Sequence, residues 1–209
     1  MRGEKTWMKQ RAFLTGGFFF TCIVGTLLHF AYEWSGRHIL VGLIVPIGES
    51  TWEHLKMVFF PTVLWMLGGQ VLLRKTSPGI LAACAAGVCA GMLTVVTFFY
   101  TYTGILGKNW LPMDVFTFYL GVFVTFYTAG KRLGGHVGEK RRNGWAVLVL
   151  CALALCFFGF SFRAPSIGLF REPTVEAASL FGLFPASCGP VAFVLFRTLS
   201  VFPADFPAP

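Results

Sequence analysis

Long apolar blocks dominate the chain, without the strict alternation of a half-buried strand or the one-sided pattern of an amphipathic helix. Crossing a hydrocarbon layer about 30 Å thick takes roughly 18 or more apolar residues. Five blocks reach this length, and we predict transmembrane helices over residues of about 12–32, 51–73, 79–103, 111–130 and 145–162. A sixth apolar run, residues 177–199, either crosses the membrane or lies at its interface. The predicted fold is an all-α integral membrane protein with five to six transmembrane helices in a single membrane domain, residues 1–209.

Two details refine this prediction. The apolar segment His38–Gly48 is about half the length of a crossing and ends at Pro46 and Gly48, so we expect a short re-entrant or interfacial segment between the first two spans. In the third span, small residues recur at four-residue intervals, which allows another helix backbone to approach closely. These residues are Ala83, Gly87 and Gly91.

Composition and charge agree with a membrane protein. Hydrophobic residues make up 56% of the chain and charged residues only 12%, against about 25% charged residues in soluble domains. The net charge of +8 does not indicate a nucleic-acid partner, because the basic residues group at the ends of the apolar blocks. With the N-terminus in the cytoplasm, eleven Lys and Arg residues lie inside and four outside. The positive-inside rule therefore predicts this orientation.

With this orientation, the unusual polar residues gather at the outer ends of the predicted helices. Ionisable side chains near the membrane usually mark a polar cavity or a functional site. We therefore expect an outward-facing polar pocket, formed by His29, Glu33, Glu49, Ser50, Glu53, His54, Lys56, Tyr100, Tyr102 and Asp114.

Within this set, two histidines and two carboxylates could ligate a divalent metal ion such as zinc, or relay protons. They are His29, Glu33, Glu49 and His54. The chain has no H-E-x-x-H motif, and the cofactor stays open.

The other members of the set have structural explanations as well. Ser50 and Glu53 fit a capping box, in which Ser50 caps the helix and Glu53 reaches back to the Ser50 amide. Glu53 and Lys56 could form an ion pair, and Asp114 suits the first turn of a helix. Tyr100 and Tyr102 fit an aromatic belt at the membrane interface.

Four segments of the chain also resemble a known family. They are LHFAYEWSG (Leu28–Gly36), PIGESTWEHLKMVFFP (Pro46–Pro61), FYTYTGILGKN (Phe99–Asn109) and FRAPSIGLFREP (Phe162–Pro173). They are similar to uncharacterised multi-pass membrane proteins of bacteria and archaea, the domain-of-unknown-function family 6512, over about residues 12–173. The resemblance implies several helices in a bacterial or archaeal plasma membrane and no assigned activity. Gly48 stands where this pattern leads us to expect Asn.

Three functions remain open at this stage. The first is binding or transport of a small solute or ion in the polar pocket, by a chain that could form a homo-oligomer in the lipid bilayer. The second is an intramembrane metal-dependent enzyme acting on a lipid-linked substrate, with Glu49 or Glu53 as general acid or base and His29 and His54 as metal ligands or proton carriers. The third is a structural or assembly role, in which the polar residues only tie helices together.

Overall fold

The protein is all-helical in the part that the computed structural model describes, residues 2–73, 79–133 and 139–171. Five helices in these ranges are long and apolar enough to cross a membrane. They are α1 (Arg2–Trp34), α3 (Thr51–Leu72), α4 (Ile80–Leu106), α5 (Leu111–Leu133) and α6 (Glu139–Phe162). Two short elements accompany them: α2 (Ile39–Gly42) and the 3-10 helix η1 (Gly168–Phe170).

The predicted all-α fold with five long apolar helices is confirmed, and the helices extend past several of the predicted ends. α1 begins about ten residues earlier than expected, within the basic N-terminal segment, and α5 continues through Lys131 and Arg132. Apolar length sets only the stretch inside the membrane, and cations in a last helical turn favour continuation because they complement the helix dipole. The sixth apolar run, residues 177–199, lies outside the described residues.

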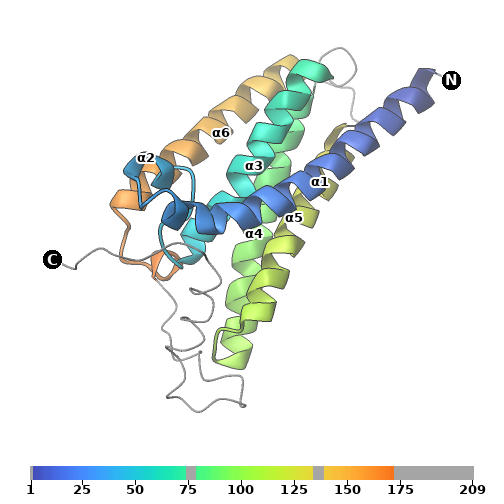
Figure 1. Cartoon of the computed structure of the whole chain (residues 1–209). Helices are drawn as coiled ribbons and strands as arrows, with labels where there is room; N and C mark the ends of the chain where they lie inside the picture. Colours follow the sequence, from blue (N-terminus) through green and yellow to red (C-terminus); the bar gives the residue numbers. More distant parts are fainter. Residues whose placement is uncertain (1, 74–78, 134–138, 172–209) are drawn as a thin grey trace.

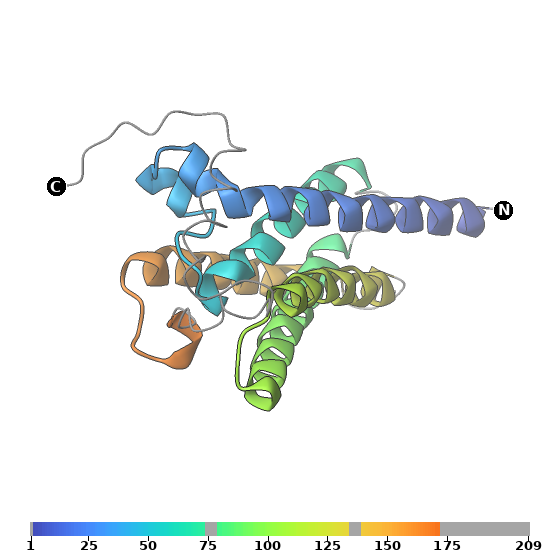
Figure 2. The same cartoon turned by 60° about the horizontal axis from the view of Figure 1, so that its bottom comes forward.

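Helix α4 is central to the bundle because it packs against α3, α5 and α6. Helix α1 crosses obliquely over the bundle and contacts α3 and α5 (Figure 1). In Figure 1 the hairpin formed by α4 and α5 projects beyond the other helices, and in Figure 2 the end of α4 projects beyond them. At this end of the bundle, α1 finishes, α3 begins, α4 finishes and α5 begins.

Small residues allow α4 and α5 to pack backbone to backbone, as the sequence predicted. A Cβ on Gly87 would lie 2.5 Å from the Thr125 carbonyl oxygen, and a Cβ on Gly91 would lie 2.6 Å from the Gly121 carbonyl oxygen. Any larger side chain at these positions would push the helices apart. The C-terminal end of α4 is capped by Gly107. Its φ of 66° is the left-handed conformation in which many helices end.

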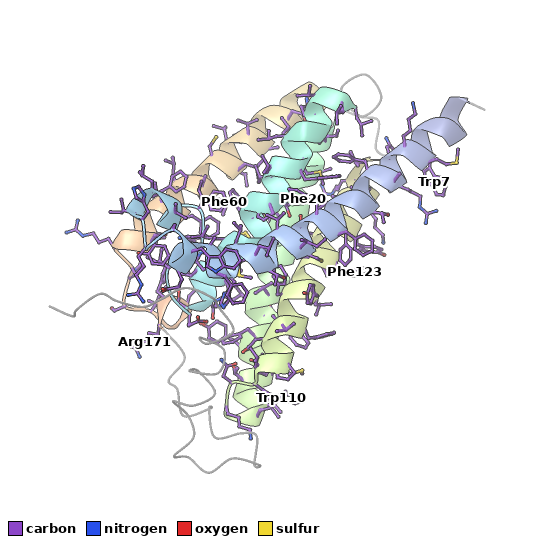
Figure 3. The ribbon with its side chains drawn as sticks, in the orientation of Figure 1. Trp7, Phe20, Phe60, Trp110, Phe123 and Arg171 are labelled. Carbon is purple, nitrogen blue, oxygen red and sulfur yellow. The ribbon has the colours of Figure 1, made fainter. Side chains whose placement is uncertain are left out.

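The outer surface of the bundle is apolar. Each long helix exposes large hydrophobic side chains, among them Phe19, Leu64, Leu93, Phe123 and Leu148. Figure 3 shows side chains projecting from all the helices, with Trp7 and Trp110 at opposite ends. A surface of this kind suits a lipid environment. Buried apolar residues fill the interior, including Val58, Met66, Val88 and Val122.

Candidate metal centre and adjoining cavity

Three of the predicted site residues meet at the end of the bundle where α3 begins. His29 lies in the last turns of α1, Glu49 in the turn before α3, and His54 in the first turn of α3. One ligand atom from each lies within 4.8 Å of the other two. We call these three residues the His–Glu–His cluster; it joins positions that are 25 residues apart in the chain.

The two distances from Glu49 to the histidines are slightly longer than those between ligands of one metal ion. Glu49 Oε1 lies 3.9 Å from His29 Nε2, and Glu49 Oε2 lies 3.6 Å from His54 Nε2. These distances are too long for direct hydrogen bonds. Two ligand atoms bound tetrahedrally to zinc at about 2.1 Å lie about 3.4 Å apart. Small side-chain rotations would therefore bring all three ligands onto one ion.

The orientation of the His54 ring also suits a ligand. His54 Nδ1 lies 2.9 Å from the carbonyl oxygen of Ser50. Because a carbonyl only accepts, we assign the ring proton to Nδ1, which leaves the lone pair of Nε2 facing Glu49. Metal-binding histidines commonly donate their second ring N–H in this way. The His29 ring packs beside it, with ring centroids 5.3 Å apart.

A buried ion pair holds the chain segment that presents Glu49. Lys56 is fully buried, and its Nζ donates to Glu53 Oε2 at 2.8 Å and to the carbonyl oxygens of Gly42 at 2.9 Å and Val45 at 3.2 Å. Glu53 Oε2 also accepts from the backbone N–H of Ile47 at 2.9 Å. These bonds fix residues 42–47 against α3. Glu53 and Lys56 therefore position the site and do not line it.

The predicted capping box is half formed. Ser50 Oγ accepts from the Glu53 N–H at 3.3 Å, so Ser50 caps α3 as expected. The Glu53 carboxylate, however, binds the amide of Ile47, and its other oxygen accepts from the Ser161 hydroxyl at 3.3 Å. The prediction that Glu53 reaches the Ser50 amide is wrong, because Lys56 and the folded-back segment draw the carboxylate to the other side.

A cavity of about 380 Å³ adjoins the cluster. His29, Glu49, His54 and Asp114 line it on the polar side. Most of its wall is apolar and comes from α1, α3, α4 and α5, with Phe30, Met57, Val58, Val95, Phe99 and Phe118 among the lining residues. Its volume lies in the range of small-molecule sites, roughly 300–1,000 Å³.

Asp114 is held at the cavity by hydrogen bonds at the α4–α5 turn. The Tyr102 hydroxyl donates to the Asp114 carboxylate and also lies 2.6 Å from Asn109 Oδ1. Tyr102 is buried, whereas an interfacial aromatic belt would expose it. Its role in the fold is therefore to fix Asp114 and the turn.

Two further predicted residues lie apart from the cluster. Glu33 is exposed and pairs with Arg37, with Arg37 Nη2 3.0 Å from Glu33 Oε1. The hydrogen bond to Glu33 raises the pKa of Arg37. Tyr100 is exposed on α4 and packs edge-on against Phe99. Neither residue lines the cavity.

Sequence reasoning missed much of the cavity wall. Asn109 lines the cavity, and so does Thr26, whose Oγ1 lies 3.4 Å from the Tyr119 hydroxyl across the α1–α5 contact. Thr26 precedes His29 by three residues and so shares its helix face, which was an available signal. The apolar wall residues carry no such signal, because apolar residues occur on every face of these helices.

Comparison with known proteins adds a family and no activity. No curated protein and no solved structure matches the chain. Residues 1–178 match DUF6512, a family of unknown function. The match covers most of the chain, including every residue of the His–Glu–His cluster and the cavity. The chain therefore belongs to the DUF6512 family.

Proposed function

We propose that this chain is a multi-pass membrane protein that binds a divalent transition-metal ion, with zinc as the best fit, at His29, Glu49 and His54. The observation that carries the proposal is the convergence of two imidazole nitrogens and a carboxylate within 4.8 Å of one another. Imidazole and carboxylate ligands at this number and spacing suit zinc. We place the cluster near the outer leaflet of a bacterial or archaeal plasma membrane, with the N-terminus in the cytoplasm.

The packing of the bundle favours binding over conduction. The cluster and its cavity lie at one end of the bundle, and buried apolar side chains fill the described interior beyond them. Beyond the site, the buried polar side chains in the described part of the bundle are threonines such as Thr21, Thr62 and Thr125, which carry no charge to balance that of an ion. Transfer of an unpaired charge into such a medium is strongly unfavourable. The same chain in a homo-oligomer could still provide a path between copies.

Elemental analysis of the purified protein in detergent tests the proposal. After incubation with zinc and removal of the excess, we expect about one zinc ion per chain. Loss of a supporting residue around a metal typically costs about 10- to 100-fold in affinity, so loss of a ligand should cost at least as much. Glu49→Gln and His54→Ala should therefore abolish stoichiometric zinc.

Two matched control variants test whether a loss of zinc is specific to the cluster or follows from the loss of any histidine or carboxylate. His38→Ala removes a histidine from the exposed turn after α1, and Glu33→Gln removes the carboxylate that pairs with Arg37. Both should retain the wild-type zinc content. A wild type without zinc would refute the proposal. If the wild type is metal-free and the folded Glu49→Gln variant is less stable than the wild type, the polar residues have the structural role of tying helices together.

A second candidate function is zinc-dependent catalysis on a lipid-linked substrate. Three protein ligands leave one coordination position for water or substrate, as in catalytic zinc sites. Asp114 lines the same cavity and could act as a general base. This candidate predicts zinc-dependent hydrolysis of a fluorogenic acyl ester, lost in an Asp114→Asn variant that keeps its zinc. Bound zinc without turnover would favour binding alone.

A further inference from the structure

We infer that the cavity beside the cluster binds a single-chain amphiphile, with an oxygen-donor head group on the metal ion and its apolar chain along the wall. The inference rests on the proposed metal site and names its ligand class. The chemical class is a fatty-acid-like molecule whose head group carries at most one negative charge.

The cavity is polar on one side and apolar elsewhere, so its lining is complementary to an amphiphile, which has a polar head group and an apolar chain. The cluster and Asp114 form the polar side, and the wall opposite includes Phe99 and Phe118. A small hydrated solute would leave this aromatic and aliphatic wall in contact with water. An alkyl chain would cover it, and burial of apolar surface is favourable in proportion to its area.

The cavity is also reachable from the lipid-facing surface. Several lining side chains are partly exposed on the outside of α1 and α5: Phe30, Leu111, Val115 and Tyr119. These helices touch at Thr26 and Tyr119, and α5 then leads away from α1 toward the projecting α4–α5 turn (Figures 1 and 3). Because these lining side chains are exposed on helices that face lipid, we infer that a molecule dissolved in the bilayer reaches the cavity from the side of α1 and α5.

Charge and coordination limit the head group. Two neutral imidazoles and one carboxylate leave a zinc ion with a net charge of about +1 and one open coordination position. Asp114 adds a negative charge at the cavity wall. A carboxylate or similar oxygen donor can fill the open position, whereas a multiply charged head group would be repelled by Asp114.

Cobalt-loaded protein in lipid nanodiscs provides the test, because the visible d–d absorption of Co²⁺ changes when its fourth ligand changes. Acetohydroxamate and octanohydroxamate present the same metal-binding group with a short and a long chain. Val115 is 47% exposed and lines the cavity, so Val115→Trp should obstruct the chain without disturbing the buried core. We expect Val115→Trp to weaken octanohydroxamate roughly tenfold and to leave acetohydroxamate unchanged.

The control is Val147→Trp on α6, where Val147 has a similar exposure of 43% and does not line the cavity. It should bind both hydroxamates like the wild type. Because membrane partitioning of the long chain is the same for every variant, only a change in the ratio of the two affinities counts. An unchanged ratio in Val115→Trp, with cobalt bound and both hydroxamates binding, overturns the amphiphile. If the wild type binds neither cobalt here nor zinc in the elemental analysis, the proposed metal site itself is wrong, and the amphiphile inference that rests on it is overturned as well.

Discussion

At the scale of single residues, Lys56 is not a proposed metal ligand, but its removal should strongly affect both stability and zinc binding. Its ammonium group has three donors, and three acceptors surround it: the Glu53 carboxylate and the carbonyl oxygens of Gly42 and Val45. Lys56→Met leaves the Glu53 carboxylate without its cation. Breaking a buried pair in this way typically costs about 3–5 kcal/mol. We expect a clearly lower thermal unfolding temperature and weaker zinc binding, because the segment that carries Glu49 loses its anchor.

The double variant Glu53→Gln/Lys56→Met separates loss of the charge pair from loss of packing. Removing both charges leaves no unpaired ion, so the double variant should recover part of the stability lost by Lys56→Met alone. A double variant less stable than Lys56→Met would show that packing, and not the unpaired carboxylate, causes the loss.

Residue-level reasoning from the sequence works where the partner is close in the chain. The Ser50 cap and the Glu53–Lys56 pair follow from local spacing, and the structure contains both. Glu33 has the same four-residue spacing from His29 as from Arg37, so spacing alone could not decide its partner. The bonds from Lys56 to the carbonyl oxygens of Gly42 and Val45 join residues 14 and 11 positions apart, which no local pattern encodes.

At the scale of elements, the α4–α5 contact should tolerate no side chain at Gly91. A Cβ there would lie 2.6 Å from the Gly121 carbonyl oxygen and still closer to the Thr125 hydroxyl. Because the Gly121 oxygen belongs to the backbone, the helices must separate. Overpacking of this kind costs about 1–3 kcal/mol, so Gly91→Ala should lower the unfolding temperature. Folded Gly91→Ala should still bind zinc, since no metal ligand lies on α4 or α5.

Gly104→Ala is the matched control on the same helix. A Cβ at Gly104 meets no atom within 4 Å, and Ala is the better helix former by about 1 kcal/mol. This variant should be as stable as the wild type or more so. If both variants behaved alike, the close approach of α4 and α5 would not contribute to stability.

Sequence patterns predict elements better than they predict how the elements pair. The starts of α3 and α5 lie where the apolar blocks begin, and the small residues of α4 mark a close contact. Nothing in the sequence indicates that α5 is the helix in that contact, or that α1 crosses α3 and α5. Apolar side chains on every face leave helix neighbours undetermined, because lipid and protein are equally good partners for them. The cavity depends on this pairing and was for that reason only partly predictable.

At the scale of the whole molecule, the two ends of the bundle differ in a way that predicts its orientation. The basic ends of α1 and α5 lie away from the α4–α5 turn, which carries Trp110 (Figures 1 and 3). Lys and Arg near helix ends are retained in the cytoplasm. The turn, the cluster and the cavity should therefore face the outside, where a metal ion or a lipid of the outer leaflet can reach them.

Cysteine labelling in intact cells tests this orientation. Lys108→Cys, in the α4–α5 turn, should react with a membrane-impermeant maleimide added outside, and Arg141→Cys, at the start of α6, only after the cells are permeabilised. The wild type is the background control, because its described cysteines lie within the apolar helices and should stay unlabelled. Labelling of Arg141→Cys from outside would reverse the topology. The cluster would then face the cytoplasm, and the zinc and amphiphile would have to come from inside the cell.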